Sequence, residues 1–262
     1  MRSRILPLRQ LAGLLILPNI LALAQLTARQ ERPPDGGTRE VLVSILIPSL
    51  ANAPFSATVN TEWIRKLADG TTITLKNHRA IARDRAGRIF QERRLLVPDD
   101  GKQESIVTQI EISDPVAHEL YICVPANRVC QVEYFSPPTS APPRPAGSTP
   151  RLPGFPIRED LGKQSLAGLD TVGTRETTVI EAGAIGNDNP IQTTLEYWYS
   201  RELGVNLISK RHDPRFGTQN FELSNIVLGE PDAGLFEVPS GSTIIDLRGS
   251  TQTTPPGASS PQ

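Results

Sequence analysis

The sequence predicts a mainly β protein: a single curved antiparallel sheet, an open half-barrel, with one or two short covering helices. Two observations lead to the prediction of a mainly β, antiparallel fold. Residues 56–97 read as three consecutive strands joined by two tight turns, and further strand-like runs follow along the chain. The length of 262 residues allows one large β domain or two small ones.

The opening three-strand segment is the best defined. Its strands, residues 56–67, 71–84 and 88–97, are rich in the Thr, Val, Ile and Trp that suit a pleated surface. Each connecting turn ends in a glycine, Gly70 or Gly87, which can adopt the positive φ that a short hairpin connection requires. We therefore expect these three strands to be neighbours in the sheet.

Residues 1–24 have the pattern of a signal peptide. Three Arg residues precede an apolar run that closes with Ala-Leu-Ala at residues 22–24. The alternative is a membrane anchor, but Pro18 and Asn19 interrupt the run, which is shorter than the roughly 20 apolar residues that span a bilayer. The sequence thus predicts an exported protein, periplasmic or extracellular, that does not span the membrane after signal cleavage.

Charge argues against a nucleic-acid partner. Removing residues 1–24 takes away three Arg and no acid, so the formal net charge moves from −1 to −4, with 24 basic residues facing 28 acidic ones. No block of basic residues is present, and aromatic residues make up 5% of the chain. A basic face or a stacking platform for bases is therefore not expected.

The rest of the chain divides by composition. After the signal peptide we expect an N-terminal segment (25–53), a first half of the β domain (54–135), a Pro-rich linker or insertion (136–157), a second half (158–248) and a disordered tail (249–262). The apolar run 41–50 reads as a strand or a partly helical lead that covers the sheet.

Further elements follow in order. Alternating Ile residues predict a strand over residues 106–112, and residues 159–162 suggest one helical turn. The next strands are a pair or one bent strand (164–180), a hairpin (193–199 and 205–212) and a strand (216–228). Residues 231–236 read as a short helical turn with Phe236 packed inward.

Two cysteines flank a natural four-residue turn at residues 125–128. If Val124 faces Val129 across this turn, Cys123 faces Cys130. A disulfide is the preferred interpretation, since export permits oxidation, and it would stabilise the fold by about 2–3 kcal/mol at most. The alternative is a pair of buried thiols.

No catalytic or metal-binding motif emerges, so we predict no catalytic residues, no metal site and no cofactor. The three histidines lack the spacing of a zinc site, and no G-x-S-x-G nucleophile motif is present. Carboxylates on predicted strands would suit a glycosidase only if two of them faced each other across a cleft: Glu62, Glu92, Glu111, Glu176 and Glu196. The histidines are His78, His118 and His212.

Arginines gather in the second and third strands. The cluster comprises Arg79, Arg83, Arg85, Arg88, Arg93 and Arg94. Interleaved Glu and Asp residues favour a solvated strand face with cross-strand ion pairs, each worth little when exposed. The alternative is an anion-binding face.

Several segments resemble uncharacterised secreted bacterial proteins, over most of residues 54–240. The resemblance rests on the sequences TEW at 61–63, LADGTTI at 67–73, KNHR at 76–79, GRIFQERR at 87–94, GTRET at 173–177, GNDNP at 186–190, DPRFG at 213–217 and GEPD at 229–232. More remotely, the order of long strands and the closing P-x-x-x-x-F-x-V-P at 231–239 resemble the Lol lipoprotein carriers and the periplasmic sigma-regulator sensors (LolA/LolB/RseB-like). That resemblance implies a curved half-barrel with an open apolar concavity that buries an acyl chain.

The leading functional hypothesis is therefore a periplasmic or secreted non-enzymatic protein that binds a lipid or lipoprotein acyl chain. The expected apolar lining comprises Val59, Trp63, Ile73, Leu75, Tyr197 and Phe221; the alternative is that these residues form an ordinary filled core. A second hypothesis is a structural or interaction module of the cell envelope, with another envelope protein as its partner. An envelope hydrolase is the third.

Overall fold

The computed structural model describes residues 42, 44–135 and 156–249. The predicted signal peptide, nearly all of the Pro-rich segment and all but the first residue of the predicted tail lie outside the described residues. Among the described residues, no helix is long and apolar enough to cross a membrane.

The described residues form one sheet of thirteen strands. The strands before the Pro-rich segment are β1 (Phe55–Lys66), β2 (Thr72–Arg83), β3 (Ile89–Arg94), β4 (Val97–Pro98), β5 (Val107–Asp114), β6 (Glu119–Val124) and β7 (Val129–Tyr134). Those after it are β8 (Ile157–Leu166), β9 (Leu169–Ile180), β10 (Ile191–Ser200), β11 (Val205–Asp213), β12 (Gly217–Leu228) and β13 (Thr243–Asp246), with one 3-10 turn, η1 (Ala233–Phe236), before β13.

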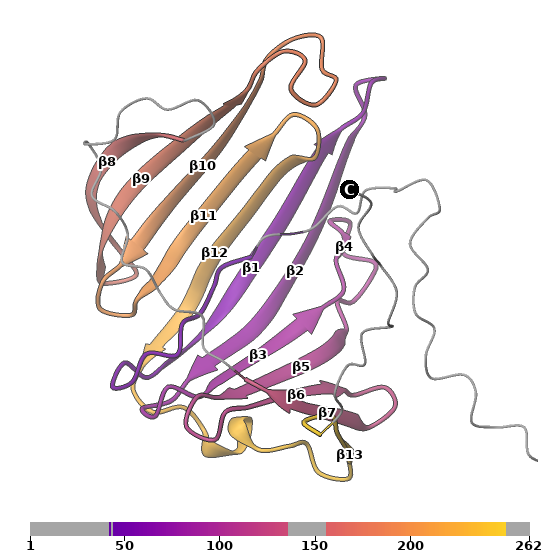
Figure 1. Cartoon of the computed structure of the whole chain (residues 1–262), viewed down its shortest axis with the longest axis vertical. Coiled ribbons are helices and arrows are strands. Elements are labelled where there is room, and N and C mark those ends of the chain that lie inside the picture. Colours follow the sequence, from indigo (N-terminus) through magenta and orange to yellow (C-terminus); the bar gives the residue numbers. More distant parts are fainter. Residues whose placement is uncertain (1–41, 43, 136–155, 250–262) are drawn as a thin grey trace, which may run out of the picture. The chain divides into compact units, whose positions relative to one another are not determined.

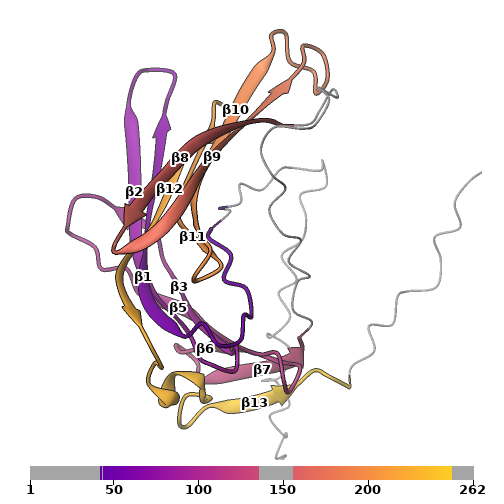
Figure 2. The same cartoon turned by 90° about the vertical axis from the view of Figure 1, so that its left-hand side faces the viewer.

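The sheet is open and curved, as predicted. Its strand order is β13-β7-β6-β5-β3-β2-β1-β12-β11-β10-β9-β8, with β4 pairing on β2. The edge strands β13 and β8 do not pair with each other, and Figures 1 and 2 show the sheet face-on and from the side. The recorded strand pairs are antiparallel, except for the parallel pair of β13 with β7.

The predicted opening meander is confirmed: β1, β2 and β3 are neighbours in the sheet. Both turn glycines have positive φ, 85° at Gly70 and 86° at Gly87. On its other side β1 pairs with β12, so a strand near the start of the described chain lies beside one near its end. This pairing joins the strands that precede the Pro-rich segment to those that follow it.

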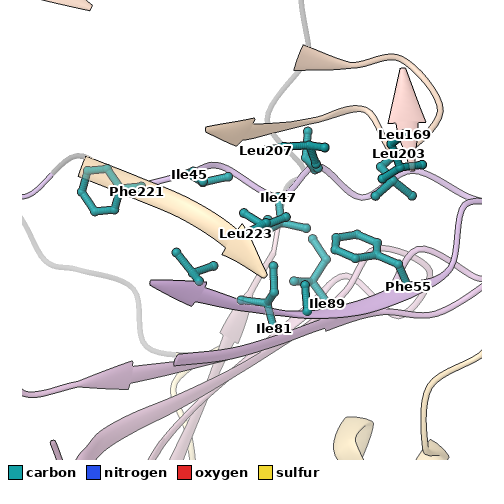
Figure 3. Packing of buried hydrophobic residues seen from close by; sticks show 13 residues of the cluster. Ile45, Ile47, Phe55, Ile81, Ile89, Leu169, Leu203, Leu207, Phe221 and Leu223 are labelled. Carbon is teal, nitrogen blue, oxygen red and sulfur yellow. The ribbon is translucent and has the colours of Figure 1, made fainter. Parts of the chain in front are cut away.

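The main core lies on the concave face of the sheet. Alternate β1 residues, Phe55, Ala57 and Val59, are buried there, because successive strand residues point to opposite faces. Ile45 and Ile47, from the extended segment 44–50, belong to the same cluster (Figure 3), and Figure 2 shows this segment in indigo on the inner side of the sheet. The expectation that residues 41–50 cover the sheet is thus confirmed for residues 44–50, by an extended chain and not a helix.

A second, smaller core lies on the opposite, convex face. It contains Ala82, Phe90 and Ile112, which face one another across β2, β3 and β5. Phe236 of η1 completes this cluster, so the predicted helical turn with an inward Phe is confirmed. η1 is the one helical element of the described chain, at the lower end of the one or two short covering helices that the sequence suggested.

Three local details differ from the predictions. Residues 159–162 are not a helical turn but part of the edge strand β8, where the pairing register shifts between Asp160 and Gly162. The two-residue strand β4 and the four-residue strand β13 were not predicted, since such short strands show no alternating pattern. By contrast, the segment 164–180, predicted as a strand pair or one bent strand, belongs to the strand pair β8 and β9, as the first alternative expected.

The cysteine hairpin has the register expected from the sequence. Val124 faces Val129 and Cys123 faces Cys130 across the β6–β7 pair. The two cysteines form a disulfide, with an S–S distance of 2.06 Å.

The turn between β11 and β12 is organised by Asp213, whose side chain is buried. Its carboxylate accepts hydrogen bonds from the Arg215 backbone N–H at 3.0 Å, from Nε at 2.9 Å and from Nη2 at 2.7 Å. The hydrogen bonds from Arg215 hold the pKa of Asp213 below its usual value, against the opposing effect of burial. The charged form of Asp213 is therefore the one that the fold favours.

We expect Asp213→Asn to lower the free energy of unfolding by about 1.5–3 kcal/mol at neutral pH, the value of hydrogen bonds to a charged group. Because the folded-state pKa is lowered, this contribution is fully present above the unfolded pKa, near 4, and is lost as pH falls through the folded value. Urea unfolding at several pH values, with the exposed Asp170→Asn as control, measures it. A deficit that stayed constant down to pH 2 would contradict this account.

Candidate functional site

The six predicted lining residues all project from the concave face. In the β1–β2 ladder Val59 faces Arg79 and Trp63 faces Leu75, while Ile73 lies two residues further along β2. The remaining two are placed by the next ladders, where Phe221 faces Ser209 and Ser209 faces Tyr197. Side chains directly opposite each other in a ladder share a face, so these strands bring the six together on one surface.

Burial divides this set into two parts. Val59 and Phe221 are fully buried members of the main core, with exposures of 0% and 2%. For these two, the filled-core alternative describes their environment. Trp63, Ile73, Leu75 and Tyr197 are only half-buried. We name these four residues the apolar row.

Hydrogen bonds and ring contacts hold the two aromatic side chains of the apolar row. The Trp63 indole donates from Nε1 to the Phe216 carbonyl at 2.8 Å, and the Arg65 guanidinium lies 4.6 Å from the Trp63 ring centroid. The Tyr197 hydroxyl donates to Glu176 at 3.3 Å, and burial together with the Glu176 charge raises the pKa of Tyr197. Because their polar atoms are satisfied, both rings can present apolar surface without leaving an unpaired group.

Segment 44–50 covers the concave face beside the apolar row, and two arginines of β2 hold it there. Arg83 donates to the carbonyl of Pro48 at 3.0 Å, to that of Ala53 at 2.7 Å and 2.9 Å, and to that of Leu203 at 2.6 Å. Arg79 donates to the Ser44 hydroxyl at 2.9 Å. We name these contacts of Arg79 and Arg83 the arginine clamp; neither the clamp nor its partners were predicted from the sequence.

The expected solvated arginine face is wrong for these two residues. Arg79 is 5% exposed and Arg83 is 0% exposed, and burial lowers the pKa of each to about 10. The expected cross-strand ion pair is found for Arg93, which pairs with Glu111 of β5. Arg94 pairs with Glu92 of its own strand, and Arg88 pairs with Asp84 across the β2–β3 turn. Arg93 lies on the same face of the sheet as Arg79 and yet is exposed, so the burial of an arginine here depends on its position in the sheet and not on the charge pattern.

The two best-formed cavities of the described chain do not include the apolar row. One, of about 720 Å³, is lined on the convex face by polar residues of β1, β2 and β12 and is roofed by residues 97–105. The other, of about 570 Å³, lies at the β8–β9 turn beside Arg201 and Glu202. Both are lined largely by polar and charged side chains, so neither resembles an acyl-chain site.

The side chains considered for acid–base catalysis are either ion-paired or exposed in this structure. Each of the five strand carboxylates considered for a glycosidase forms an ion pair: Glu62 with Lys76, Glu92 with Arg94, Glu111 with Arg93, Glu176 with Arg158, and Glu196 with Arg175. His78, His118 and His212 are exposed and lie on separate elements. No group of three His, Cys, Asp or Glu side chains within the described residues is arranged to hold a metal ion.

No family model matches the sequence, and the search of curated proteins finds no match. Solved structures similar to this chain include the Pseudomonas aeruginosa MucA/MucB complex (TM-score 0.37, 15% identity), covering 71% of this chain and 56% of the matched chain. Others are LprF from Mycobacterium bovis (0.30, 10%, covering 73% and 91%) and a LolA superfamily protein from Nitrosomonas europaea (0.24, 11%, covering 70% and 90%).

These neighbours include a LolA superfamily protein, which is one of the kinds of protein that the sequence resembles. The aligned part of the chain spans just over half of the matched chain in the MucA/MucB complex. At such identities the likeness concerns the fold alone.

Proposed function

We propose that this protein is an exported, non-enzymatic carrier or sensor that binds the acyl chain of a lipid or lipoprotein on the concave face of its sheet. The observation that supports it most is the apolar row: four large side chains, half-buried, on one face of an open sheet. An acyl chain laid over this row would gain roughly 0.8 kcal/mol for each CH₂ group removed from water. The signal-peptide pattern of residues 1–24 supports export.

The two tryptophans of the chain provide an internal test, because they lie on opposite faces of the sheet. Trp63 belongs to the apolar row. Trp198 faces Gly173 and projects from the other face; a Cβ added at Gly173 would come within 2.7 Å of its ring. A quencher carried by a bound acyl chain should therefore reach one ring and not the other.

We expect a brominated stearic acid to quench the fluorescence of Trp198→Phe, which keeps only Trp63, in a saturable manner. The matched variant Trp63→Phe, which keeps only Trp198, should show no saturable quenching. Native mass spectrometry of residues 25–262 from a periplasmic preparation would reveal a co-purifying lipid that disappears on solvent extraction. Equal quenching of both variants, or of neither, would contradict acyl binding at this site.

A second candidate is an interaction module of the cell envelope. It is favoured by two observations: the chain's own segment 44–50 packs into the main core on the concave face, and the two cavities described above are lined mainly by polar and charged residues. A clean apo mass, with no lipid regained on incubation and no quenching at Trp63, is the outcome that would support this alternative.

A further inference from the structure

Arg79 is a buried cation whose hydrogen-bond partners are neutral. Its Nη1 donates to the Gln91 side-chain oxygen at 3.3 Å, and its Nη2 donates to the Ser44 hydroxyl at 2.9 Å. No carboxylate of the described chain lies within ion-pair distance of the Arg79 guanidinium. Among the described residues, this guanidinium at 5% exposure has lost water and gained neutral hydrogen-bond acceptors but no ion pair, which is an unfavourable state for a charge.

The neighbouring charged groups leave this position positive. Arg93 repels Arg79, while Glu111 and Glu92 attract it. Both carboxylates are already engaged: Glu111 accepts from Arg93 at 2.9 Å, and Glu92 accepts from Arg94 at 2.8 Å. Gln91 links the two sites, because its amide also donates to Glu111 at 2.6 Å. The three arginines therefore outnumber the two carboxylates, and one positive charge around Arg79 is left unbalanced.

The Ser44 hydroxyl occupies the place where an anionic oxygen would form an ion pair with the Arg79 guanidinium. Ser44 belongs to segment 44–50, which forms no strand ladder with the sheet and packs on it through Ile45 and Ile47. An oxyanion in place of this hydroxyl would offer two acceptor oxygens to the planar guanidinium, the geometry that arginine binds best.

We propose that the ligand of the concave face is a single-chain amphiphile with an anionic headgroup, a carboxylate or a phosphate, and that its oxyanion replaces the Ser44 hydroxyl on Arg79. This rests on the proposed acyl-binding function and specifies its ligand class. Val59 lies directly opposite Arg79, and the apolar row begins at Trp63 and Leu75 in the same ladder. Arg79 and Ile73 are six residues apart on β2, or about 20 Å at the rise of a strand, which suits an extended long acyl chain.

The test compares two ligands with the same tail, palmitate and 1-monopalmitoylglycerol, for wild type, Arg79→Gln and the exposed control Arg85→Gln. Wild type should bind palmitate at least about tenfold more tightly than the neutral monoglyceride, a difference expected for a charge-assisted bond. Arg79→Gln should lose that preference while its affinity for the monoglyceride stays within about twofold. Arg85→Gln should behave as wild type. Hexadecyl phosphate, tested beside palmitate, distinguishes a phosphate from a carboxylate headgroup.

The outcomes separate the two proposals. Equal binding of palmitate and monoglyceride by the wild-type protein would overturn the proposed preference for an anionic headgroup and leave acyl binding intact. This outcome needs no variant. A palmitate preference that survives in Arg79→Gln would also overturn it. Binding of neither ligand would overturn both the headgroup and the acyl-binding function.

Discussion

Arg83→Met is expected to lower the free energy of unfolding by about 3–5 kcal/mol, the cost of leaving buried polar groups unpaired. The guanidinium satisfies the carbonyls of Pro48, Ala53 and Leu203 at once, and Met supplies no donor to any of them. The same change removes the stacking of the guanidinium over Phe55, 5.0 Å from the ring centroid. Urea unfolding measures the loss, and limited proteolysis within residues 44–53 reports whether the segment is released.

Arg79→Met is the matched comparison for this prediction. It removes an arginine of the same strand and the same face, but the partners of Arg79 are the side chains of Ser44 and Gln91, which can turn to other groups. We expect a loss of at most about 1 kcal/mol, because the change also removes a buried charge that has no ion pair among the described residues. If the two variants were equally destabilised, the unpaired carbonyls would not be the reason for the effect at Arg83.

Gly217→Ala is expected to cost about 3–5 kcal/mol, from positive-φ strain and steric overlap together. Gly217 opens β12 with φ of 89°, and an added Cβ would lie 2.2 Å from the backbone oxygen of Ile64 on β1. A backbone atom cannot rotate away, so either the β11–β12 turn or the β1–β12 pairing must shift. Thermal and urea unfolding of the purified variant measure the effect.

Gly70→Ala separates the two causes. Gly70 has nearly the same φ, 85°, but nothing lies within 4 Å of an added Cβ. Its expected cost is about 1 kcal/mol, from backbone strain alone. A similar loss at both positions would show that strain, and not the approach of β1, governs Gly217.

The hairpins could be predicted because their determinants are local. The alternation in β1 and β2, Gly70 and Gly87 in the turns, and the register of Cys123 with Cys130 all depend on residues close in sequence. The edge strand β8 was misread at residues 159–162, because an exposed edge strand with a register shift lacks a clear period of two. The six apolar residues were named as a lining because of the family resemblance, and only the strand pairing shows that they share one face; their role toward a ligand stays a prediction.

By itself, the sequence determined that this chain builds antiparallel strands joined in hairpins, since periodicity and turn glycines are local; the open, curved form of the sheet was implied by the family resemblance. Only the tertiary structure decided which side of that sheet is closed, and by what. Leu203 is 120 residues from Arg83, and β12 follows β1 by more than 150 residues, so the clamp and the central ladder depend on contacts that no local pattern specifies. Arg79 and Arg83 of β2 would be exposed to solvent if segment 44–50 did not cover the inner face of the sheet. Their burial is therefore a property of the assembled fold and not of the strand sequence.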